Sequence, residues 1–133
     1  MITEDYVSFE IAKLLKEKGF NEKLLTFYLT DEAKKEGCFQ IMAFTDDKID
    51  NNHSDHCYLA PTLQMVMKWL REMHKYFIEI RYSFEGEGEC GYMFKIRKIG
   101  EDDIGIWSLN DKLYDSYEDA CEAAIKYCLE NLI

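Results

Sequence analysis

The 133-residue sequence has little of what marks several classes of protein. It holds one proline, three histidines, and sixteen basic against twenty-six acidic residues, a formal charge of −10. Its longest charge-free stretch, 57–67, is far short of the ~20 apolar residues that cross a membrane. Nucleic acids and anionic lipids are held by dense cationic patches, so the charge argues against a protein that grips either with its whole surface. A charged partner is expected to be basic.

The N-terminus also lacks the features of an export signal. Acidic residues follow Met1 where a signal peptide is basic, and no apolar run or small-residue cleavage site comes after them. The five cysteines are odd in number and scattered, which is typical of thiols in a reducing compartment and not of a disulfide framework. These observations predict a cytoplasmic protein with reduced cysteines.

What the sequence does have is enough apolar material for a core. The 47% hydrophobic content exceeds that of a disordered acidic chain. No stretch rich in Gly, Ser or Pro divides the chain, so residues 1–133 are expected to form a single domain.

Three segments have the apolar spacing of amphipathic helices. The first is expected to begin after an N-cap at Thr3 and to end at Gly19. The second runs from Pro61 to about His74, and its broad apolar surface predicts a sheet on one side and another helix or a partner subunit on the other. The third begins at Ser116.

Aromatic and β-branched runs predict strands over 25–29, 38–44, 76–84, 92–96 and 104–109. The first two are expected to form a hairpin. Segments 76–84 and 92–96 alternate cleanly and are expected to form another. The order is α-ββ-α-ββ(β)-α, and the predicted class is α+β, an antiparallel sheet of four to five strands covered by helices. The two hairpin–helix units also raise the hypothesis of an internal duplication.

One polar loop, 45–57, contains residue types that bind metals. His53, Asp55, His56 and Cys57 lie within five positions, and imidazole and thiolate suit zinc or another transition metal. No second pair of ligands follows at a set spacing, although Cys38 or His74 are conceivable additions. The loop is therefore interpreted as hydrated, with no metal or cofactor expected and these four residues as the metal candidates.

Signatures of catalysis are not evident. The segment 86–91 matches G-x-G-x-x-G but is expected to join two strands, whereas the dinucleotide fingerprint opens a helix. No serine or cysteine lies in a nucleophile motif, so no catalytic residue is assigned and the chain is not expected to be an enzyme. An enzyme with a dispersed site remains a hypothesis.

The only concentration of basic residues is Arg81, Lys95, Arg97 and Lys98. Binding of RNA to a sheet requires aromatic and cationic side chains on the same exposed face. Alternation places Tyr92 and Phe94 on the face opposite Lys95, so these aromatics are assigned to the core. Cross-strand ion pairs with Glu79 are expected instead.

Three blocks, 1–20, 60–72 and 117–133, resemble a family of small proteins from gut bacteria of the Bacteroides group and from their prophages and other mobile elements. They cover somewhat under half of the chain. The resemblance implies an intracellular accessory protein, of phage or mobile-element origin, and it supplies no catalytic residues.

The resulting hypothesis is a small, non-enzymatic interaction protein that binds a protein partner or a second copy of itself, without nucleic acid or membrane. One alternative is a small-ligand or metal-binding domain that uses the 45–57 loop. A second is an acidic DNA mimic that inhibits a basic protein. Residues 1–66 and 67–133 each carry −5, and this even spread weakens the mimic hypothesis.

Overall fold

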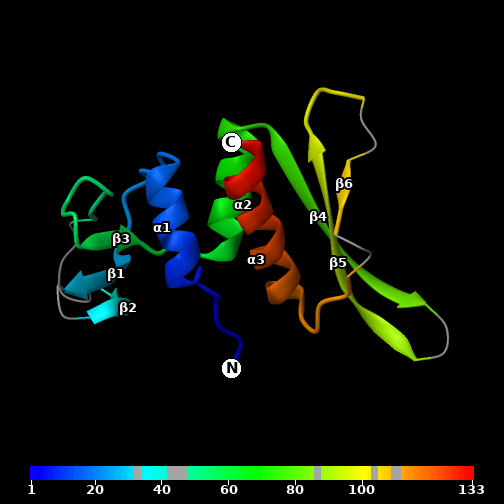
Figure 1. Ribbon diagram of the computed structural model, residues 1–133, viewed down its shortest axis with the longest axis horizontal. Coiled ribbons are helices and arrows are strands. Elements are labelled where there is room, and N and C mark those ends of the chain that lie inside the picture. The colour runs from blue at the N-terminus through cyan, green and yellow to red at the C-terminus, as the bar shows by residue number, and fades with distance from the viewer. Residues whose placement is uncertain (32–33, 42–47, 86–87, 103–104, 109–111) are drawn as a thin grey trace. The chain divides into compact units, whose positions relative to one another are not determined.

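The chain forms two compact units, Met1–Thr62 and Leu63–Ile133, and each is described by itself (Figure 1). A computed structural model describes residues 1–31, 34–41, 48–85, 88–102, 105–108 and 112–133. The expectation of a single domain over 1–133 stays a prediction. In the described residues, no helix has both the length and the apolar character needed to cross a membrane.

The first unit begins with an extended segment and then helix α1 (Phe9–Glu17). The Ser8 hydroxyl accepts a hydrogen bond from the Ile11 N–H at 3.3 Å and so caps the helix. The expected cap at Thr3 is therefore wrong. The predicted end is confirmed, because Gly19 has a φ of 86°, a conformation that glycine adopts without strain.

The first unit's sheet has the order β2-β1-β3. Strands β1 (Thr26–Asp31) and β2 (Lys34–Ile41) form the expected antiparallel hairpin; the predicted extension over 42–44 lies outside the described residues. Strand β3 (Cys57–Leu59) pairs with the other edge of β1. Its three residues are too few for an alternation to be seen in the sequence, and its first residue, Cys57, falls in the predicted polar loop.

An aromatic row crosses this sheet. Tyr28 of β1 lies opposite Phe39 of β2 and opposite Tyr58 of β3. The ring of Phe9, from α1, contacts Tyr28 at a centroid distance of 5.5 Å and Tyr58 at 5.4 Å. A Cβ on Gly37 would lie 2.5 Å from the Phe9 ring, so only glycine allows the helix to approach β2 this closely.

The second unit contains helices α2 (Leu63–Met73) and α3 (Tyr117–Tyr127), and α3 continues as a π-helical turn, η2 (Cys128–Leu132). The Ser116 hydroxyl caps α3 by accepting from the Asp119 N–H at 3.0 Å, as predicted. Helix α2 packs against both β4 and α3, which confirms the expectation of a sheet on one side and a helix on the other. Met65 and Met73 remain exposed.

The second unit's sheet has the order β4-β5-β6. Strands β4 (Tyr76–Glu85) and β5 (Glu89–Lys98) form the second predicted hairpin, and β6 (Ile106–Trp107) pairs with β5. Figure 1 shows α2 and α3 side by side along one face of this hairpin. Ile78, Phe94 and Ile96 on that face are buried. The predicted ends of the β6 segment, residues 104 and 109, lie outside the described residues.

These elements confirm the α+β class but not the single sheet. The described strands form two three-stranded antiparallel sheets, so the order is α-βββ-α-βββ-α. The prediction of one sheet was wrong because alternation specifies strands and faces, whereas the choice of partner depends on contacts between distant residues. The two sheets also differ in topology: the central strand is the first of its unit in one and the second in the other. This difference does not support a duplication.

The cysteines divide into exposed and buried thiols. Cys38 and Cys90 are exposed, whereas Cys57, Cys121 and Cys128 are buried, and none of the five forms a disulfide. Burial raises the pKa of Cys121 to about 11 and the pKa of Cys128 to about 12. The thiolate is the reactive form, so both burial and protonation protect these two residues.

We predict that iodoacetamide at about pH 8 modifies Cys38 and Cys90 in the native protein and leaves Cys121 and Cys128 unmodified. Peptide mass spectrometry measures each site. The same protein in denaturant is the control and should react at all five thiols. Rapid modification of Cys121 or Cys128 under native conditions would contradict the packing of α3.

Candidate functional site

The 48–57 segment of the first unit is held by a buried asparagine. Asn51 is 7% exposed. Its side-chain amide donates to the Phe20 carbonyl at 2.6 Å, and its side-chain oxygen accepts from the Leu59 N–H at 3.0 Å. Asn51 thereby joins the end of α1 to β3. The interpretation of this loop as simply hydrated is wrong at Asn51 and at Ile49, which is also buried.

A lysine ties α1 to the end of the same loop. The Lys16 ammonium donates to the carbonyls of Ser54 and Cys57, both at 2.8 Å. It also lies 4.7 Å from the centroid of the Tyr58 ring. Burial raises the pKa of the Cys57 thiol, and the charge of Lys16 partly offsets this effect. Lys16 is therefore fixed in position before any ligand arrives.

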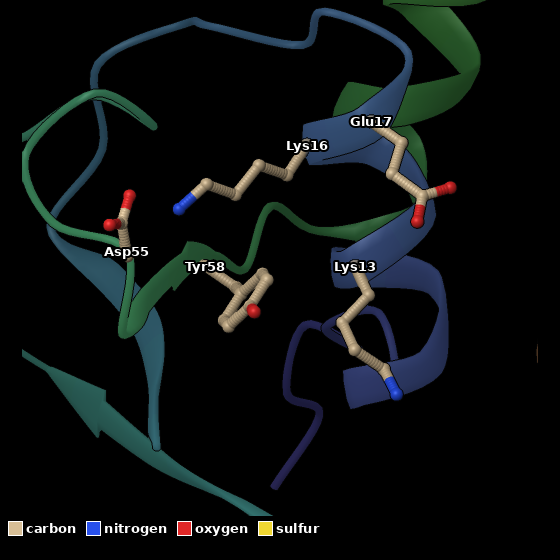
Figure 2. Close-up of a pocket in the computed structure, with 5 residues that line it drawn as sticks. All are labelled: Lys13, Lys16, Glu17, Asp55 and Tyr58. Carbon is tan, nitrogen blue, oxygen red and sulfur yellow. The ribbon is translucent and has the colours of Figure 1, made fainter. Parts of the chain in front are cut away.

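Between α1 and this loop lies a cavity of about 330 Å³, lined by Lys13, Lys16, Glu17, Asp55 and Tyr58. Figure 2 shows Lys16 reaching from α1 toward the segment that carries Asp55, above the Tyr58 ring. Lys13, one turn earlier, lies with its ammonium 4.7 Å from the centroid of the Phe9 ring. The charged ends of Lys13 and Glu17 are directed away from Lys16 and Asp55 (Figure 2), so the cavity offers one cation, one carboxylate and one aromatic wall.

The four metal candidates are not arranged as a metal site. His53, Asp55 and His56 are exposed, whereas Cys57 is buried on β3. Among the residues that the structure describes, no three His, Cys, Asp or Glu side chains lie close enough together to hold an ion. Of the four, only Asp55 contributes to the cavity.

A second surface feature lies on the β4-β5-β6 sheet, on the face opposite α2 and α3. Register places Glu79 opposite Lys95, and Lys95 opposite Trp107. The Lys95 ammonium lies 4.4 Å from the centroid of the Trp107 ring, and the Arg81 guanidinium carbon lies 5.1 Å from it. We define the basic patch as the group of apolar and cationic side chains on this face: Phe77, Arg81, Met93, Lys95, Arg97 and Trp107.

The carboxylate of Glu79 lies among these cations, and they lower its pKa. Arg81 donates to Glu79 at 2.6 Å and this hydrogen bond lowers the pKa of Glu79, with further lowering from the charges of Arg81, Lys95 and Arg97. Lys95 is only 7% exposed, and its ammonium lies against the electron-rich face of Trp107. The patch is a cationic region on an acidic unit.

Comparisons with protein-family models, curated proteins and solved structures find no match.

The sequence predicts part of the basic patch and, of the five residues that line the cavity, singles out only Asp55. It identified the basic residues, and it placed Tyr92 and Phe94 on the opposite face correctly. It missed that Phe77, the exception to the alternation of β4, and Trp107, in a two-residue strand, supply aromatics on the cationic face. It also missed the cavity, because the lysines of α1 and the loop are brought together only by the fold.

We predict that Asn51→Ala lowers the free energy of unfolding by about 3 kcal/mol, because the Phe20 carbonyl and the Leu59 N–H lose their buried partner. Urea denaturation measures the change. Asn52→Ala is the matched control: Asn52 is exposed, so the loss there should stay within about 0.5 kcal/mol. Equal effects of the two substitutions would show that Asn51 does not anchor the loop.

Proposed function

We propose that this chain is a non-catalytic, cytoplasmic interaction protein that binds a short acidic segment of a partner protein on the basic patch. The composition of the patch supports the proposal. Arginine, tryptophan, phenylalanine and methionine are enriched at protein interfaces, and the first two dominate binding energies. Phe77 is 43% exposed, and Arg97 is also exposed. An accessory role in a prophage or mobile element belongs to the same proposal and is supported only by the resemblance of the three sequence blocks.

Charge complementarity favours an acidic ligand of limited length. The second unit holds nine basic and fourteen acidic residues, and three of the nine basic residues lie in the patch. A short acidic segment fits within this region, whereas a longer polyanion would extend over acidic surroundings. Binding of nucleic acid usually engages more cations than three. The Trp107 ring, moreover, already contacts Arg81 and Lys95, and bases stack on free ring faces.

The DNA-mimic alternative has less support. Each of the two compact units carries −5, so neither concentrates the negative charge that would imitate a phosphate backbone.

We predict that a fluorescein-labelled peptide of alternating glutamate and leucine binds the wild-type chain, and that Arg97→Glu weakens binding about tenfold, or about 1.4 kcal/mol. Fluorescence anisotropy at several salt concentrations measures both, and added salt should weaken binding. Lys68→Glu is the control, because it makes the same charge change at an exposed position on α2.

Two outcomes would contradict the proposal. One is equal binding of the peptide with glutamine in place of glutamate. The other is tighter binding of a single-stranded DNA oligonucleotide than of the acidic peptide, which would assign the patch to nucleic acid.

The cavity of the first unit favours a second candidate function, the binding of a small zwitterion such as an amino acid with an apolar side chain. Lys16 would take a carboxylate, Asp55 an ammonium group, and Tyr58 an apolar or aromatic side chain. The observation that favours it is the fixed position of Lys16, whose ammonium is oriented by two backbone carbonyls. Preorganised groups bind at a lower entropic cost.

We predict that L-phenylalanine and phenylacetate both bind, and that Asp55→Asn weakens only the first, because only phenylalanine carries an ammonium group. Isothermal titration calorimetry measures both affinities. Lys23→Met, at an exposed position outside the cavity, serves as a control and should change neither. Failure of both ligands to bind would remove this candidate.

A further inference from the structure

Strand β4 has an edge on which its backbone groups point away from the sheet. The Ile99 N–H donates to the Lys75 carbonyl at 2.7 Å, in register with the β4–β5 ladder. Odd-numbered residues of β4 therefore direct their N–H and C=O toward β5, and even-numbered residues direct theirs outward. The outward set is Tyr76, Ile78, Ile80, Tyr82 and Phe84. In the described residues, β5 is the only strand that pairs with β4.

This edge carries few of the devices that prevent strand pairing. Strand β4 is ten residues long, it holds no proline, and its register with β5 is regular throughout. Three of its apolar side chains are exposed: Phe77 by 43%, Tyr82 by 60% and Phe84 by 71%. A long, regular and apolar edge is a template for another strand.

We infer that this edge pairs with the same edge of a second copy of the chain. The two β4 strands run antiparallel about a two-fold axis at Ile80, and the two sheets join into a continuous six-stranded sheet. This inference goes beyond the proposed function and does not rest on it, because strand pairing uses the outward backbone groups of β4, whereas the proposed ligand binding uses side chains of the basic patch, two of which, Phe77 and Arg81, lie on β4.

The charges on β4 select this register. With the axis at Ile80, Glu79 of each copy lies opposite Arg81 of the other, in the closely spaced pairs of an antiparallel ladder. An axis at Glu79 or at Arg81 would instead place like charges opposite each other.

Apolar side chains on the other face match in the same register. Tyr76 lies opposite Phe84 of the second copy, and Ile78 lies opposite Tyr82. The exposed rings of Tyr82 and Phe84 are thereby covered, and all five outward-directed residues find backbone partners. The charge pairing of Glu79 with Arg81 at the register that covers all five outward residues favours a second copy over a strand of a different protein.

Sedimentation velocity of the full chain tests the inference. Wild type should form a dimer whose fraction rises with concentration. Glu79→Arg and Arg81→Glu should each raise the dissociation constant at least about tenfold, because two attractive cross-strand pairs become repulsive. The Glu79–Arg81 pair within one strand is solvent-exposed, so its loss should leave the fold intact. Circular dichroism checks this.

Mixing the two single variants is the decisive step. In a mixed dimer both positions again pair opposite charges, so the mixture should recover the wild-type dissociation constant, as should the double variant Glu79→Arg/Arg81→Glu. Amide hydrogen exchange at Ile78 and Ile80 should slow as the wild-type dimer forms. A wild-type chain that stays monomeric would overturn the inference and leave the edge to a strand of another protein. Single variants that dimerise normally, or a mixture that does not recover, would also overturn it.

Discussion

The uninterrupted ladder between β4 and β5 is the constraint on which the second unit depends. Ten consecutive pairs, from Tyr76–Lys98 to Glu85–Glu89, are in register. Side chains alternate between the two faces of a strand, so a shift of one residue would exchange the inner and outer sets. The ladder therefore decides at once which side chains pack under α2 and α3, which form the basic patch, and which backbone groups reach the free edge.

The first unit depends instead on side chains that satisfy backbone groups. Asn51 bonds the end of α1 and β3, and Lys16 bonds two carbonyls of the adjoining loop. A buried backbone group without a partner costs free energy comparable to a lost hydrogen bond. These two side chains let an irregular segment pack against a helix, and the cavity exists because the segment is held there. The hydrogen bonds of Asn51 and Lys16 therefore both stabilise the first unit and form the candidate ligand site.

The sequence predicted the elements that are specified by residues within one short segment. The 3.6-residue spacing of α2, the cap at Ser116 and the alternation of β4 each lie within one segment, and the structure contains all three. The cap of α1 was misplaced because Val7 has helical spacing from Ile11 but is buried in extended chain. The pairing of β3 with β1, the hydrogen bond from Asn51 to Phe20 and the cavity depend on residues about thirty or more positions apart, which no local pattern encodes.

Exceptions to a regular pattern carry the most functional information in this chain. Phe77 interrupts the alternation of β4, and Trp107 lies in a strand of two residues. Alternation alone predicts a polar side chain at position 77. Packing alone does not require an indole beside Lys95. Both aromatics lie on the cationic face, where burial does not demand them, and the proposed binding of an acidic segment would give them a role. Local violations of folding rules are expected at functional sites. The exposed rings of Tyr82 and Phe84 are a further exception, and the inferred pairing of β4 with a second copy would cover them.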